Sequence, residues 1–114
     1  MPLPVDSEWI IKRESAPQQV IKITASDATT FSAVYLDIDN PSKFTGEVRT
    51  RALTIMSLRQ HAEGTNYTAF HVGARQGSLD EYVGSWWDVA HGFSGTFNLS
   101  LRSAVAQETA PGER

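Results

Sequence analysis

The chain has 114 residues, of which 40% are hydrophobic and 20% charged, a composition typical of one globular domain and too apolar for intrinsic disorder. Ten Lys and Arg against thirteen Asp and Glu give a formal net charge of −3, so the overall field offers no attraction to nucleic acid. The absence of cysteine excludes disulfides, thiolate metal ligands and cysteine nucleophiles.

The start of the chain indicates no export signal. Residues 1–8 contain Pro2 and Pro4 but neither the basic segment nor the apolar segment of a secretory signal. We therefore expect a surface tail over residues 1–8 and a cytoplasmic protein. No apolar run approaches the roughly 20 residues that a membrane helix needs, so we expect no membrane association.

Short apolar and β-branched runs alternate with turn signals from Trp9 onward. The strands predicted in chain order cover residues 9–13, 19–25, 29–38, 43–50, 51–61, 67–74, 82–87 and 93–101. Asn40-Pro41 marks the strongest loop, because proline disfavours a helical residue before it and lacks a ladder donor. Gly46 indicates a bulge or a close backbone approach. The run 51–61 also has some helical spacing, but it lacks capping residues, so we assign it to a strand.

The stretch from Tyr82 to Leu101 reads as a hairpin around a polar turn at residues 88–92. Its second arm alternates strictly, as a strand with one buried face requires. The expected inward residues are Phe93, Gly95, Phe97, Leu99 and Leu101.

Eight short strands without a crossover helix must pair antiparallel. Closure into an up-and-down barrel removes the exposed sheet edges, and eight strands leave an interior that is filled or holds one small ligand. The sequence therefore predicts an all-β, eight-stranded antiparallel barrel over residues 9–103, with a C-terminal tail over 104–114. A two-sheet sandwich is the alternative.

In layout the chain resembles the calycins, which include lipocalins, fatty-acid-binding proteins and avidins. That group places a first-strand Trp against a basic residue of the last strand, and Trp9 and Arg102 stand at corresponding positions. The resemblance therefore implies cation–π contact between them. The lipocalin pattern Gly-x-Trp occurs as Gly84-Ser85-Trp86, on the seventh strand rather than the first.

Aromatic residues are the main candidates for a ligand site. Trp86 and Trp87 are adjacent on one strand, so one faces the interior and the other faces outward. The inner Trp either fills the core or forms a ligand wall, and the outer one indicates a homo-oligomer, most simply a dimer. Tyr35, Tyr67 and Tyr82 combine an apolar ring with a hydroxyl, which suits small-molecule pockets but also suits a barrel rim.

The three histidines, His61, His71 and His91, lack the short spacing of metal motifs, so we expect no metal site. His71 is a candidate general base or ligand hydrogen-bond donor, with a structural histidine as the alternative.

The arginines Arg49, Arg51 and Arg59 form a loose basic group around the fourth and fifth strands. This group either binds an anionic partner or is simply a solvated face.

No catalytic, phosphate-binding or dinucleotide motif is present, and we expect no cofactor. The leading hypothesis is therefore binding of a small apolar or amphipathic molecule in the barrel interior. The predicted ligand-binding residues are Trp86, Trp87, Tyr35, Tyr67, Tyr82, His71 and Arg59. The alternatives are a small barrel enzyme of the isomerase or cyclase type and a filled barrel that binds other proteins.

Overall fold

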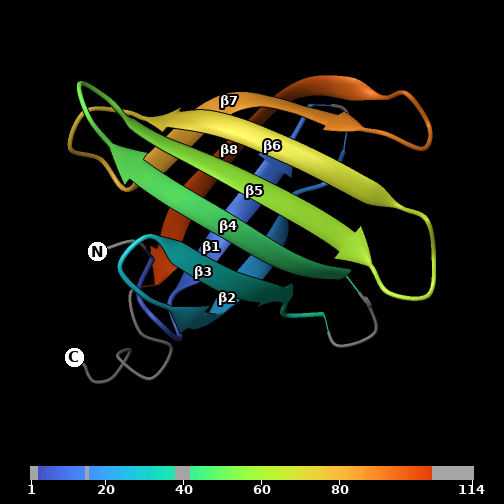
Figure 1. Cartoon of the computed structure of the whole chain (residues 1–114), viewed down its shortest axis with the longest axis horizontal. Coiled ribbons are helices and arrows are strands. Elements are labelled where there is room, and N and C mark those ends of the chain that lie inside the picture. Colours follow the sequence, from blue (N-terminus) through green and yellow to red (C-terminus); the bar gives the residue numbers. More distant parts are fainter. Residues whose placement is uncertain (1–2, 15, 38–41, 104–114) are drawn as a thin grey trace.

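The computed structural model describes residues 3–14, 16–37 and 42–103. They form eight antiparallel strands in which each strand pairs with its neighbours in chain order. β1 also pairs with β8, which closes the sheet into an up-and-down barrel (Figure 1). The strands are β1 (Glu8–Arg13), β2 (Gln19–Ser26), β3 (Thr30–Tyr35), β4 (Ser42–Thr50), β5 (Thr54–Ala62), β6 (Thr68–Arg75), β7 (Glu81–Asp88) and β8 (Ser94–Ser103). The predicted fold is confirmed.

Two strand limits lie three residues from their predicted positions, and the others lie within two residues. The ambiguous run 51–61 is a strand, but β5 begins only at Thr54, because Arg51 N donates to Leu53 O in the hairpin turn. β3 ends at Tyr35, ahead of the predicted limit Ile38, which lies outside the described residues. Among the residues that are described, no helix is long and apolar enough to cross a membrane.

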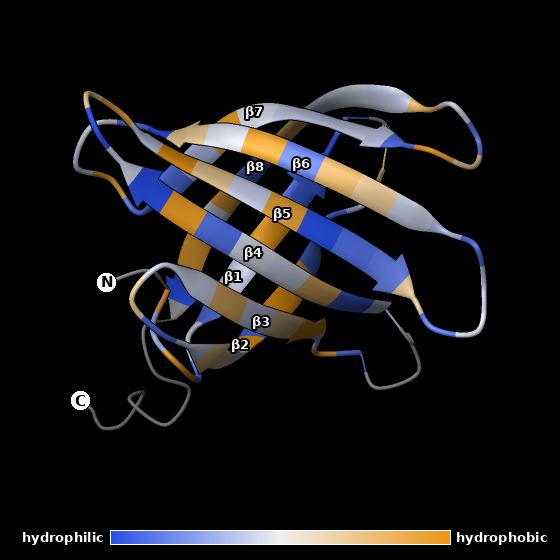
Figure 2. Cartoon of the chain, viewed as in Figure 1, coloured by the Kyte–Doolittle hydropathy of each residue, from blue (hydrophilic) through white to orange (hydrophobic). Residues whose placement is uncertain are grey.

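Alternation along the strands places one apolar set inside the barrel, and the change of hydropathy from residue to residue is visible in Figure 2. Trp86 faces the interior and is buried, whereas Trp87 faces outward and is 42% exposed. The buried apolar core is made of Leu3, Trp9, Ile11, Ile21, Ile23, Phe31, Ala33, Tyr35, Phe44, Met56, Leu58, Ala69, Tyr82, Trp86, Phe97 and Leu99.

Phe93 does not belong to the inward set. It lies in the turn before β8 and is 64% exposed, so the prediction for this residue is wrong. Alternate residues of β8 are buried only where the strand pairs with both β1 and β7. Phe97 and Leu99 lie in this part and are buried as predicted.

Gly46 pairs in register with Phe31 and Leu58, so it is not a bulge. A Cβ at this position would lie 2.3 Å from Phe31 Cζ. The predicted close approach is therefore made by the Phe31 ring, which packs directly against the Gly46 backbone. The register shifts in β2 instead, between Ile23 and Ala25.

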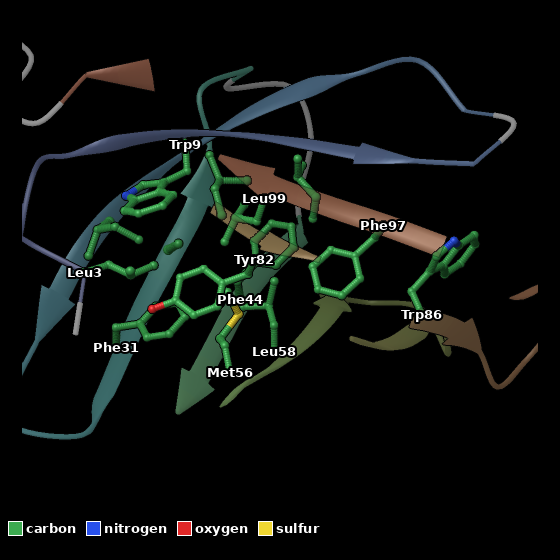
Figure 3. Close-up of a cluster of buried hydrophobic side chains, with 14 of the residues drawn as sticks. Leu3, Trp9, Phe31, Phe44, Met56, Leu58, Tyr82, Trp86, Phe97 and Leu99 are labelled. Carbon is green, nitrogen blue, oxygen red and sulfur yellow. The ribbon is translucent and has the colours of Figure 1, made fainter. Parts of the chain in front are cut away.

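The N-terminal segment closes the barrel end nearest Trp9, which we call the Trp9 end. Asp6 N donates to Ile23 O, and Ile23 N donates to Ser7 O, which extends the pairing beyond β1. Leu3 and Ser7 are buried, so part of the predicted surface tail is built into the core. Figure 3 shows Leu3 and Trp9 grouped at this end, with Trp86 at the opposite end.

The cation–π contact expected between Trp9 and Arg102 is not formed. Trp9 pairs in register with Leu101, so the next residue along β8, Arg102, points to the outer face, where it makes an ion pair with Glu8 at 3.4 Å. Trp9 instead donates its indole N–H to Ser7 Oγ at 2.9 Å and packs against Tyr82, with ring centroids 6.4 Å apart.

Candidate functional site

A buried polar network occupies the barrel end opposite Trp9, which we call the Arg13 end. Arg13 is the last residue of β1 and shares the inward face with Trp9 and Ile11. Its Nε donates to His71 Nε2 at 3.0 Å, and its Nη2 donates to Gln60 Oε1 at 2.5 Å and to Tyr35 OH at 3.5 Å. Gln60 Nε2 in turn donates to Tyr35 OH and to Ser42 Oγ, both at 3.1 Å. Five strands thus contribute to one hydrogen-bonded cluster.

His71 is held neutral in this network. Its Nε2 accepts from Arg13, so the ring proton lies on Nδ1, which donates to Leu58 O at 3.3 Å. The pKa of His71 is lowered from 6.5 to about 3, chiefly by burial and also by the Arg13 charge, while the Leu58 bond opposes both effects. With both nitrogens engaged and no exposed surface, His71 is a structural acceptor for Arg13.

Arg13 is only 7% exposed, yet it makes no ion pair with a carboxylate anywhere in residues 3–14, 16–37 and 42–103. Its guanidinium carbon lies 5.6 Å from the centroid of the Trp86 ring, a cation–π distance. A buried charge is costly unless it is paired, and here neutral acceptors and one aromatic face provide the compensation. The site therefore retains positive charge.

Trp86 carries an unsatisfied hydrogen-bond donor at this end. Its indole N–H is buried and has no hydrogen-bond partner. Gly95 faces it across the β7–β8 pair, and a Cβ at Gly95 would lie 3.4 Å from Trp86 Nε1 and 2.9 Å from Glu14 Oε1. Glu14 Oε1 accepts from Thr96 N at 3.2 Å. Because Gly95 has no side chain, the Glu14 side chain lies close to the strand here, beside a donor that lacks an acceptor.

The β7–β8 turn forms an aromatic rim over the Arg13 end. The His91 ring lies 6.2 Å from the Tyr67 ring and 6.0 Å from the Phe93 ring, between centroids. Asp88 anchors the turn: its Oδ1 accepts from Ala90 N and His91 N, and its Oδ2 lies 2.9 Å from His91 Nδ1. Burial raises the pKa of the Asp88 carboxyl, but these hydrogen bonds outweigh burial and lower it below its ordinary value.

The structure brings together four of the predicted site residues and separates the other three. Tyr35, His71 and Trp86 lie in or against the polar network, and Tyr67 lies in the rim above it. Tyr82 lies against Trp9 at the opposite end. Trp87 and Arg59 line a groove on the outer face of the barrel.

The predicted group of three arginines does not assemble. Arg49 and Arg51 line a hollow near Tyr82, together with Arg75. Arg59 pairs in register with Thr45, four residues before Arg49 along β4, which corresponds to about 13 Å along a strand. Arg49 is also bonded to Glu47 at 2.9 Å, and Arg75 to Asp80 at 3.2 Å.

Sequence reasoning missed Arg13, Gln60 and Ser42 as parts of the site. Arg13 could have been found, because it continues the inward alternation of Trp9 and Ile11. Gln60 likewise continues the inward alternation of Met56 and Leu58. No cluster of three or more potential metal ligands occurs in the described part of the chain.

Together these features define a closed antiparallel β-barrel with one end sealed by the N-terminal segment and the other lined by a polar and aromatic network. Comparison with protein-family models, with curated proteins and with solved structures found no match to the chain.

Proposed function

We propose that this protein is a calycin-like barrel that binds a small amphipathic molecule at the Arg13 end. The head group of the ligand accepts hydrogen bonds from Arg13 and Trp86 and is most simply a carboxylate. Its apolar part lies along the aromatic rim formed by Tyr67, His91 and Phe93. The proposal rests chiefly on two buried groups, a guanidinium without a carboxylate partner and an indole N–H without an acceptor; the guanidinium carbon lies 5.6 Å from the centroid of that indole's ring.

Charge and shape both support a carboxylate head group. A carboxylate is the group that arginine binds most strongly, and it would also offer an oxygen to the indole N–H. The carboxylates already at this end are engaged, because Glu14 holds Thr96 N and Asp88 holds the β7–β8 turn. Phe93, an exposed member of the rim, provides apolar surface at this end.

The enzyme alternative gains no support from His71. A general base needs a nitrogen within reach of a substrate, and both His71 nitrogens are hydrogen-bonded inside the network. We therefore propose binding rather than catalysis.

Calorimetric titration with decanoate tests the proposal, with decanol as the uncharged ligand of equal chain length. Wild-type protein is expected to bind decanoate more tightly than decanol. Arg13→Met should weaken decanoate binding roughly 10-fold to 100-fold, the loss of about 1.5–3 kcal/mol expected for a charged hydrogen bond. Trp86→Phe keeps the ring, removes only the N–H, and should cost about fivefold.

Arg102→Met is the matched control, because it removes the same charge from the outer face at the opposite end. Equal affinities for decanoate and decanol, or an Arg13→Met variant that is folded by circular dichroism and binds decanoate normally, would contradict the proposal.

A further inference from the structure

Apolar side chains gather on one part of the outer surface. They belong to β5, β6 and β7 and point outward, and we call this surface the outer apolar face. Its residues are Ile55, Phe70, Val72, Val83 and Trp87. Phe70 and Trp87 pair in register, and their ring centroids lie 5.8 Å apart. The outward residues of β8 are polar by contrast: Ser94, Thr96, Asn98 and Ser100. Ile55, Val72, Val83 and Trp87 are exposed on neighbouring strands, with the partly buried Phe70 among them, and such a group of apolar side chains is typical of an interaction surface.

A groove runs beside the outer apolar face over β3, β4 and β5. Short side chains line most of it: Thr30, Ser32, Thr45 and Ser57. Phe70, Val72 and Trp87 form its opposite wall. The same surface thus offers projecting aromatic rings and, next to them, a hollow bounded by small residues.

Opposite charges also lie on this surface. Arg59 stands beside Phe70 in register and makes no ion pair within the described part of the chain. Glu47 lines the same groove, one strand away, and pairs in register with Ser57, two residues from Arg59; its Oε2 accepts from Arg49 on its own strand. A two-fold axis between these two residues would bring Arg59 of each copy against Glu47 of the other.

We propose that a second copy of this chain docks on the outer apolar face, with the Phe70 and Trp87 rings of each protomer in the groove of the other. A two-fold contact requires a self-complementary surface, and this face carries both the ridge and the hollow, and both the cation and the anion. Aromatic residues and arginine are also enriched at protein interfaces. The proposed dimer rests on outward side chains, whereas the proposed ligand site rests on the inward Arg13 and Trp86, so neither proposal depends on the other.

Sedimentation velocity over a range of protein concentrations tests the dimer. Wild-type protein should reach twice the chain mass of 12.6 kDa as concentration rises. Phe70→Ser with Trp87→Ser should remain at the single-chain mass. The matched control is Val89→Ser with Phe93→Ser, which removes exposed apolar residues outside the outer apolar face and should dimerise as wild type does.

Exchanging the charges of Glu47 and Arg59 gives a second test of the dimer that does not depend on the aromatic variants. Glu47→Arg and Arg59→Glu should each raise the dissociation constant of the dimer at least tenfold, and the double exchange should restore most of the loss. Wild-type protein that stays at the single-chain mass at its highest concentration would overturn the proposal. A dimer that survives the Phe70 and Trp87 substitutions would also overturn it. So would a single-chain protein that binds a foreign peptide in the groove but not a second copy of itself.

Discussion

Acidification from pH 6.5 to about pH 4 is expected to lower the free energy of unfolding by about 3 kcal/mol, a large part of the stability of a small domain. The cause is His71, whose pKa falls from 6.5 to about 3 on folding. Between these values the unfolded chain binds a proton that the folded protein does not. Stability from this residue is therefore fully present above pH 6.5 and is lost as the pH falls towards 3.

Urea denaturation at a series of pH values measures this effect. The His71→Gln variant should lack the decline between pH 6.5 and about pH 4, since glutamine does not titrate. His61→Gln is the control, because His61 is partly exposed and lies outside the buried network, with its Nδ1 bonded to Thr68 Oγ1, and this variant should keep the decline. A wild-type stability that is level over this pH range would show that His71 is not held neutral by burial.

Gly84→Ala is expected to destabilise the barrel by about 3 kcal/mol or more, at the upper end of the range for overpacking. The added Cβ would lie 1.9 Å from Val72 O and 2.5 Å from Gly73 Cα, both backbone atoms of the paired strand β6. Backbone in the middle of a closed sheet cannot move aside without breaking ladder hydrogen bonds. The urea midpoint should fall sharply, or the variant should fail to fold.

Gly95→Ala is the matched control on the neighbouring strand. Its Cβ would lie 2.9 Å from Glu14 Oε1, the end of a flexible side chain that can move away. The loss of stability should therefore be clearly smaller than in Gly84→Ala. Equal losses in the two variants would mean that the close approach of β6 and β7 at Gly84 is not a rigid feature of the fold.

The strand order could be predicted from the sequence because each turn signal is local. The predicted polar turn at residues 88–92, for example, leads from β7 to β8, whereas the predicted Asn40-Pro41 loop lies outside the described residues. The faces of the strands were harder to predict, because a register shift of one residue exchanges inside and outside. Alternation alone therefore could not decide between Trp86 and Trp87, and it extended the inward set one position too far, to Phe93.

The candidate site could be predicted only in part. Tyr35, Tyr67, His71 and Trp86 were found by residue type, since aromatic and imidazole groups suit an interior site. The polar network around Arg13, by contrast, depends on contacts between residues far apart in the chain, such as Arg13 and His71. A basic residue at the end of a strand is usually solvated, so its type alone does not indicate burial.

The measurement that tests the proposed site most directly is a proton–nitrogen NMR titration of the three indole N–H signals with decanoate. Trp9 donates to Ser7 at the opposite end and Trp87 lies on the outer face, so both serve as internal controls. The Trp86 signal, assigned by its loss in Trp86→Phe, should move downfield and reach a limit while the other two stay in place. A Trp86 signal that does not move in excess decanoate, or movement only of Trp9 or Trp87, would contradict a ligand site at the Arg13 end.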